Sequence, residues 1–178
     1  MNLRRLVLPA ALGCSLLIPA RAFARPEVGP DVGLFAPFSG KTRDRFGSSF
    51  TSIGLGVGSV VPRAGGKLRP DFALIQRERN DNRAFLLIGG VQYRRTFDPQ
   101  PEPTQRFVPY YGAGLDLMYG RVRVPDEDRR GSSIGGGASA FLGTSIGKRT
   151  YIEARVRALS SVQSYNFSGL SLAAGVRF

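Results

Sequence analysis

The feature that most constrains this chain is a two-residue alternation between apolar side chains and small or charged ones. In the stretch from residue 107 to residue 124, Leu115 and Leu117 alternate with Gly114 and Asp116. Side chains at every second position of an extended chain point to the same face of a strand. The pattern therefore predicts β-strands that each carry one apolar face and one face of small or charged residues.

Eight segments show this alternation, and short turns rich in polar residues, Gly or Pro separate them. Each segment is about as long as a strand that crosses a bilayer in a small barrel, which needs roughly ten residues. We therefore expect an all-β fold, an eight-stranded antiparallel up-and-down transmembrane β-barrel. The predicted strands span residues 31–38, 48–61, 68–77, 83–97, 107–124, about 134–146, 150–159 and 169–178.

The last predicted strand reaches the end of the chain, where Leu170, Leu172, Ala174, Val176 and Phe178 share one face. Because an unpaired edge invites aggregation, a strand this regular should pair on both sides, and closure into a barrel achieves this. With an even number of strands, the turns should alternate between two rims. We expect residues 39–47, 78–82, 125–131 and 160–166 at the outer rim, and the connectors near Pro62, Asp98 and Gly147 at the other.

The alternation alone does not tell which face points outward, so a soluble periplasmic β-barrel with apolar residues inside is one alternative. The composition of the second face favours the membrane barrel. Glycines such as Gly54, Gly112 and Gly135 would make a poor solvent-facing surface but suit the crowded interior of an eight-stranded barrel. Charged residues on this face should then pair with one another inside. This predicted interior polar cluster comprises Arg94, Asp116, Glu153, Arg155, Arg157 and Arg177.

The N-terminal stretch, residues 1–24, has the three parts of a secretory signal peptide. Arg4 and Arg5 give a positive start, an apolar run follows, and cleavage is expected after Ala24. The apolar run is too short, and too interrupted by Pro and Gly, to remain as a membrane-spanning helix. Cleavage would remove Cys14, the single cysteine, so we expect no disulfide in the exported protein. Residues 25–178 would then form one outer-membrane barrel domain.

The chain is strongly basic, with 25 Lys and Arg against 13 Asp and Glu, a formal net charge of +12. The basic residues are scattered rather than gathered in blocks, which argues against nucleic acid as a partner. For an exported barrel the expected partner is an anionic surface, namely outer-membrane lipid or lipopolysaccharide. Two interpretations stand for Lys41, Arg43 and Arg45: contact with lipopolysaccharide phosphates, or a solvated loop.

Three short motifs occur in a fixed order: Pro109–Leu115 (PYYGAGL), Tyr151–Arg157 (YIEARVR) and Gly175–Phe178 (GVRF). Together they resemble motifs of the OmpA/OmpW-type superfamily of small outer-membrane β-barrels. The resemblance implies a place in the cell outer membrane of a Gram-negative-type envelope. It also implies that Phe178 is the C-terminal signal read by the outer-membrane assembly machinery. The chain departs from the superfamily in its very short outward loops and its lack of Trp, so Phe and Tyr must form the aromatic girdles.

The sequence contains no histidine. Barrel enzymes of the resembled kind use a histidine as base, and without His or a mature Cys a Ser–His or Cys–His nucleophile and a His/Cys zinc site are excluded. Asp116 and Glu153 are carboxylates on the inward face, and we expect them to serve as countercharges to arginines rather than as catalysts. We expect no metal and no cofactor.

These features predict a non-catalytic integral outer-membrane barrel, a monomer with a structural role in the envelope and contact with lipopolysaccharide. A small pore or a binding barrel for an apolar compound, as in OmpW-like proteins, is the main alternative. Eight strands leave an interior that side chains just fill, which disfavours open conduction.

Overall fold

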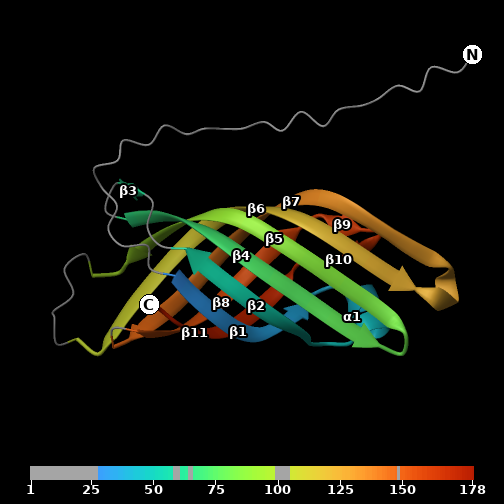
Figure 1. Ribbon diagram of the computed structural model, residues 1–178, viewed down its shortest axis with the longest axis horizontal. Helices are drawn as coiled ribbons and strands as arrows, with labels where there is room; N and C mark the ends of the chain where they lie inside the picture. Colours follow the sequence, from blue (N-terminus) through green and yellow to red (C-terminus); the bar gives the residue numbers. More distant parts are fainter. Residues whose placement is uncertain (1–27, 58–60, 64–65, 99–104, 148) are drawn as a thin grey trace, which may run out of the picture.

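The computed structural model describes residues 28–57, 61–63, 66–98, 105–147 and 149–178 (Figure 1). The predicted signal peptide, with Ala24 at its cleavage site, lies outside the described residues. No helix in the described ranges is long and apolar enough to cross a membrane.

The predicted fold is confirmed, because eight antiparallel strands form one closed sheet. Each strand pairs with its neighbours along the chain, and the first strand also pairs with the last, with Leu34 opposite Leu172. The barrel therefore has no free edge of the kind that invites aggregation. Its strands are β1 (Val28–Pro37), β2 (Phe50–Val57), β4 (Gly66–Arg79), β5 (Asn82–Thr96), β6 (Phe107–Val124), β7 (Arg129–Ile146), β8 (Thr150–Leu159) and β11 (Gly169–Val176).

Five smaller elements complete the described part of the chain. The helix α1 (Gly40–Phe46) follows β1, and the 3₁₀ turn η1 (Pro125–Glu127) joins β6 to β7. A short hairpin of β9 (Ser161–Val162) and β10 (Tyr165–Asn166) lies between β8 and β11, while β3 (Val61–Arg63) extends the edge of β4.

The observed strand ends correct several predicted boundaries. The strands β6 and β8 have the predicted bounds, but the predicted strand 48–61 is wrong, since β2 ends at Val57 and residues 61–63 form the separate strand β3. The predicted strand 68–77 begins too late, because β4 starts at Gly66, which pairs with Arg63 of β3. The predicted break at 78–82 shrinks to Asn80 and Asp81, whose φ angles of 47° and 62° fit a two-residue type I′ hairpin turn.

The final strand is also shorter than predicted. β11 ends at Val176, and Arg177 continues the pairing by one backbone hydrogen bond, from its N–H to the Arg149 carbonyl at 2.6 Å. Phe178 lies beyond the strand with 78% of its surface exposed.

The apolar face of the strands points outward, as predicted for a membrane barrel. Leu115 and Ile134 are 75% and 74% exposed, whereas the intervening Asp116 is 7% exposed. Exposed Val, Leu, Ile, Phe and Tyr side chains occur on every barrel strand, and a continuous apolar exterior of this kind is the surface that lipid covers. The soluble alternative, with its apolar faces inside, does not fit this arrangement.

The two ends of the barrel differ. The helix α1, the β4–β5 turn, η1 and the β9–β10 hairpin lie at one end, which we call the mouth (Figure 1). The C-terminus lies at the other end, the base (Figure 1). The structure thus groups residues 39–47, 78–82, 125–131 and 160–166 at one rim, as predicted.

Candidate functional site

The base half of the barrel interior holds an ionic cluster centred on β8. Because β8 alternates regularly, Glu153, Arg155 and Arg157 all point inward, and each is buried. Other strands bring acids and one more arginine to the same place across the barrel. We define the ionic cluster as Asp71, Arg94, Asp116, Glu153, Arg155 and Arg157.

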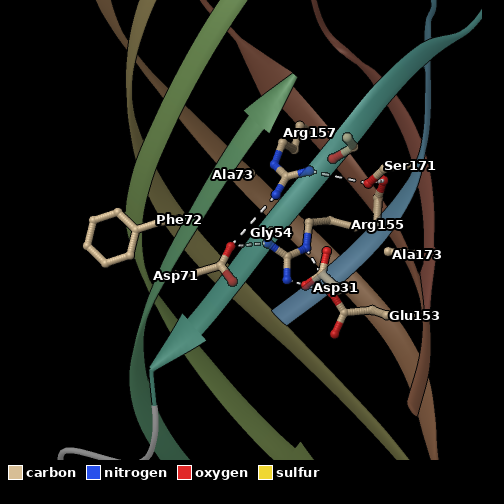
Figure 2. A pocket seen from close by; sticks show the side chains of 11 residues that line it. Asp31, Gly54, Asp71, Phe72, Ala73, Glu153, Arg155, Arg157, Ser171 and Ala173 are labelled. Atoms are coloured by element: carbon tan, nitrogen blue, oxygen red, sulfur yellow. Dashed lines mark hydrogen bonds and ion pairs between the residues drawn. The ribbon is translucent and has the colours of Figure 1, made fainter. Parts of the chain in front are cut away.

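Arg155 occupies the centre of the ionic cluster (Figure 2). Its guanidinium forms an ion pair with Asp71 and a second one with Glu153, where Nη2 lies 2.5 Å and Nε 2.9 Å from Oε1. Nη2 also donates to Gln92 Oε1 at 3.2 Å. The planar fork of arginine suits such multiple acceptors, so Arg155 connects strands β4, β5 and β8 through one side chain.

Glu153 is shared between two arginines and a phenol. Its Oε2 accepts from Arg94 Nη2 at 3.4 Å and from the Tyr110 hydroxyl at 3.2 Å. The Arg94 guanidinium lies 3.3 Å from the centre of the Tyr110 ring, a cation–π contact. All of these partners of Glu153 are polar or cationic, which makes it a countercharge in the barrel interior.

Arg157 forms the next layer of the ionic cluster. Its Nη2 lies 3.7 Å from Asp71 Oδ2, its Nε 4.0 Å from Asp116 Oδ2, and its Nη1 donates to Ser171 Oγ at 3.2 Å. Asp71 therefore lies between Arg155 and Arg157, and four strands are joined through charged groups.

All six predicted interior residues point into the barrel, and five of them meet in the ionic cluster. Arg177 does not join it, because it lies nearer the base, where Nη1 donates to Ser145 Oγ at 3.0 Å and the guanidinium lies 4.9 Å from the centre of the Tyr151 ring. Sequence reasoning missed Asp71, because the apolar run from Phe72 to Ile75 hid the alternation of its strand. The usable signal was the even spacing from Asp71 to Ala73 and Ile75, which are all buried, while Phe72 points away from the cluster (Figure 2).

Glycines on β2 make room for charged side chains from the two neighbouring strands, β1 and β4. A methyl group at Gly54 would lie 2.3 Å from Asp31 Oδ1, and one at Gly56 would lie 2.2 Å from Arg69 Nη2. The cavity beside Asp31 and Arg155 has only about 20 Å³ of space for water. Because one water needs roughly 10–15 Å³ by this measure, this cavity has room for about one water molecule.

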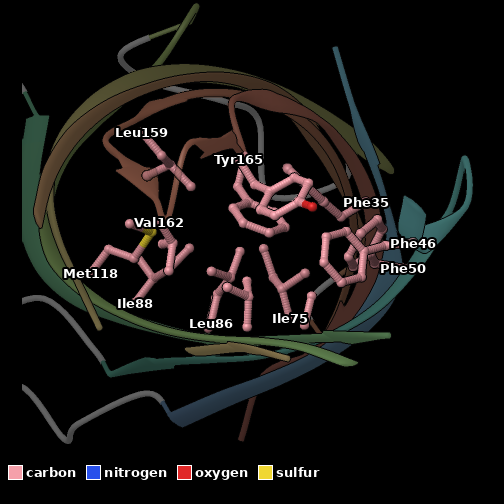
Figure 3. Close-up of a cluster of buried hydrophobic side chains, with 14 of the residues drawn as sticks. Phe35, Phe46, Phe50, Ile75, Leu86, Ile88, Met118, Leu159, Val162 and Tyr165 are labelled. Carbon is pink, nitrogen blue, oxygen red and sulfur yellow. The ribbon is translucent and has the colours of Figure 1, made fainter. Parts of the chain in front are cut away.

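The mouth half of the interior is apolar, which corrects the expectation that the inward face carries only small and charged residues. Side chains from the loops fill it and pack against apolar residues of the strands (Figure 3). Apolar loop residues that fold inward are stabilised by contact with other apolar side chains, and the inward positions of β4, β5 and β6 provide these contacts. We define the hydrophobic plug as Phe46, Val162, Tyr165 and Phe167 from the loops with Phe35, Phe50, Ile75, Leu86, Ile88, Met118 and Val122 from the strands.

Aromatic rings give the hydrophobic plug its geometry. The ring of Phe46, from α1, meets that of Tyr165 edge to face, with centroids 5.2 Å apart and planes at 77°. Phe50 and Phe167 meet at 6.1 Å and 88°. Such edge-to-face pairs add to the free energy of burial, so the helix and the β9–β10 hairpin are held in the mouth by specific contacts.

Polar contacts around Glu127 join the loops above the plug. Its carboxylate lies 2.6 Å from Arg45 Nη2 and 3.2 Å from Arg129 Nε, and it accepts from the Tyr165 hydroxyl at 3.0 Å. The Tyr165 hydrogen bond, together with Arg45 and Arg129, lowers the pKa of Glu127. Burial and the Glu127 hydrogen bond raise the pKa of Tyr165. We call Arg45, Glu127, Arg129 and Tyr165 the mouth latch.

The three basic residues considered for lipopolysaccharide do not converge on a free anion site. Arg45 belongs to the mouth latch, and Lys41 donates to Ser164 Oγ at 3.1 Å and lies 5.0 Å from the centre of the Tyr165 ring. Arg43 is exposed on α1. Two of the three therefore act within the protein.

The inward carboxylates of the described strands lie beside arginines. Asp116 and Glu153 both face arginines, and the chain contains no histidine. In the part of the chain that the structure describes, no group of three His, Cys, Asp or Glu residues could hold a metal ion.

Comparison with solved structures identifies barrels of the same architecture. Neisserial surface protein A matches with a TM-score of 0.55 and 19% identity over 85% of this chain and 95% of its own. The N-terminal β-barrel domain of Pseudomonas aeruginosa OprF gives 0.52 and 11% over 86% and 100%. The outer-membrane enzyme PagL gives 0.51 and 18% over 85% and 98%. These identities show the fold alone.

No protein-family model matches the sequence. A search of curated proteins gives no match either.

Proposed function

We propose that this chain is a non-catalytic protein of the outer membrane with a structural role in the envelope, closed to the passage of solutes. The observation that carries the proposal is the filled interior. The ionic cluster occupies the base half and the hydrophobic plug the mouth half, and both are tied to several strands. An interior packed from both ends leaves no opening for diffusion.

The outer membrane is proposed from two observations. The exterior is apolar on every strand, and the solved barrels that match the fold include the outer-membrane enzyme PagL. The predicted signal peptide at residues 1–24 is consistent with export. Within the membrane we place the mouth outside, because β1 begins and β11 ends at the base, and both ends of an even-stranded bacterial barrel are expected on the periplasmic side.

The non-catalytic role is argued from residues rather than from the fold, because PagL shows that a barrel of this kind can be an enzyme. Without histidine, acid–base chemistry would fall to interior carboxylates. Glu153 and Asp71 each lie beside two arginines, which fits a role as countercharges rather than as proton-transfer groups.

A conductance measurement tests the closed interior. The mature protein, folded in detergent and added to planar bilayers, should give no steady current. A matched variant with Phe46→Gly and Val162→Ala in the plug, and Arg155→Ala in the cluster, should give current events if filling is what closes the barrel. Steady current through the wild-type protein would replace this proposal with the pore.

A further inference from the structure

The mouth end of the barrel carries a row of arginines on its outer, membrane-facing surface. Strands β5, β6 and β7 present Arg83, Arg121, Arg123 and Arg130 outward, and these four line a groove of about 440 Å³ together with Phe85 and Tyr119. We call the four residues the arginine patch. We propose that the arginine patch binds the phosphate groups of an anionic lipid headgroup in the outer leaflet. The proposal rests on the proposed place of the barrel in the outer membrane.

The arginine patch contains like charges at direct cross-strand positions. Arg123 lies opposite Arg83 on one side and opposite Arg130 on the other. Like charges in directly opposed positions destabilise a sheet. A bound anion would relieve this repulsion. The arrangement of the arginine patch therefore favours binding of a negatively charged ligand.

Internal acids neutralise only a part of this charge. Arg83 Nη2 lies 2.7 Å from Glu78 Oε1, on the neighbouring strand β4. Among the residues that the structure describes, no acidic side chain pairs with Arg121, Arg123 or Arg130. The contrast with Arg129 is direct, because that arginine turns toward the mouth and pairs with Glu127. The groove therefore keeps a positive charge for an external ligand.

The height of the arginine patch on the barrel points to a lipid headgroup. Along β6 the outward positions are Leu115, Leu117 and Tyr119, followed by Arg121 and Arg123. Each outward step advances roughly 7 Å along the strand, so the guanidinium groups begin where the apolar band ends. Phe85 and Tyr119 in the same groove can contact acyl chains below the phosphate. Aromatic residues are common at this level of a membrane barrel.

The patch occupies one side of the barrel only. At the same end, the outward positions of the other side carry Phe38 on the loop after β1, Val156 and Ala158 on β8 and Leu170 on β11. Arginines that only lie at the level of the membrane surface, without a specific ligand, would be distributed around the whole barrel. The one-sided groove instead suits a ligand with closely spaced phosphates, since arginine forks bind phosphate oxygens bidentately.

Native mass spectrometry of the folded mature protein, titrated with a bisphosphorylated lipid A, tests the proposal. The test variant is Arg121→Gln/Arg123→Gln/Arg130→Gln, and the matched control is Arg95→Gln/Arg106→Gln/Arg149→Gln at the base, which removes the same charge. We expect the control to bind like wild type and the test variant to bind on the order of a hundredfold more weakly. Inorganic phosphate at millimolar concentration should not displace the lipid.

Two outcomes would overturn the proposal: equal affinity of the test variant and wild type, or full displacement of the lipid by inorganic phosphate, which would make the patch a simple anion site. Heat-dependent migration on SDS gels checks that each variant is folded, and the single variant Arg123→Gln, with a smaller loss of affinity, serves if the triple variant fails to fold. Recovery of the wild-type protein as a soluble monomer would instead remove the proposed function itself.

Discussion

At the scale of single residues, the two faces of β8 differ in what they tolerate. Glu153 points inward to Arg155 and Arg94, whereas Ala154 and Val156 point to the membrane. Removing one partner of a buried ion pair leaves the other charge uncompensated, which typically costs ~3–5 kcal/mol. We therefore expect Glu153→Ala to lower the free energy of unfolding by about this amount, measured by urea unfolding in lipid vesicles.

Substitutions on the outer face provide the matched controls for Glu153→Ala. Ala154→Leu should change the free energy of unfolding little, because the added methyl groups contact lipid. Val156→Arg should cost ~2–4 kcal/mol if the position lies near the membrane midplane. A neutral Val156→Arg with a disruptive Ala154→Leu would mean that the faces are reversed.

The last residue offers a second prediction at this scale. Phe178 lies beyond β11 and is largely exposed, so its ring contributes little to packing. We propose that it serves as the signal for the outer-membrane assembly machinery. Phe178→Asp should then lower the yield of inserted protein in cells while leaving the urea unfolding of already folded barrels unchanged. Equal yields at low expression would remove the reason for this proposal.

At the scale of elements, the mouth latch joins α1, η1 and the β9–β10 hairpin through Glu127. Because the pKa of Glu127 is lowered in the folded protein, its stabilising effect is complete above the ordinary value near 4.5 and is lost as the pH falls through the lowered pKa. We expect the protection factors of the α1 amides, which are corrected for the intrinsic pH dependence of hydrogen exchange, to fall at acid pH in the wild-type protein, while the strands stay protected.

The variant Glu127→Gln isolates this effect. It keeps the shape of the side chain and removes the titrating charge, so the α1 amides should have lower protection factors at neutral pH, with little further change on acidification. Asp126, which lies 3.9 Å from Arg45, is a weaker second partner, and Asp126→Asn should have a smaller effect. An unchanged pH profile in Glu127→Gln would assign the acid response to other carboxyl groups.

At the scale of the whole molecule, closure of the sheet should make the folded barrel resistant to SDS. Every strand pairs on both sides, and β1 pairs with β11 over seven residues from Asp31 to Pro37. In a membrane such a barrel satisfies its backbone hydrogen bonds internally. The mature protein should therefore resist SDS at room temperature and migrate differently after boiling. Identical migration before and after boiling would contradict a closed barrel.

The orientation of the whole barrel can be tested with epitope tags. With the mouth outside, a tag inserted at Asp128 should be labelled on intact cells, and one at Gly147 should be labelled only after the outer membrane is opened. Both positions have positive φ angles in exposed turns, so insertion there should disturb the sheet little. Labelling of Gly147 but not Asp128 would invert the topology.

The strands and their faces could be predicted from the sequence because the two-residue period is a local property of the chain. β6 and β8 have the predicted bounds, and the inward positions of Glu153, Arg155 and Arg157 follow from alternation alone. The prediction is weakest where consecutive apolar residues obscure the two-residue alternation. The apolar run from Phe72 to Ile75 hid the inward position of Asp71, and the loop before β2 gave no sign of a helix that inserts Phe46.

Only the tertiary structure decided which inward residues meet. The ion pair of Arg155 with Asp71 joins residues 84 positions apart, and it depends on how the strands are offset around the closed barrel. That offset is a property of the whole sheet and leaves no periodic signal in any one strand. For the same reason, the sequence alone does not show that the residues of the hydrophobic plug, or those of the arginine patch, lie together. Sequence alternation therefore determined a barrel with two unlike faces, and closure of the barrel decided what fills it and which of its surfaces can bind a ligand.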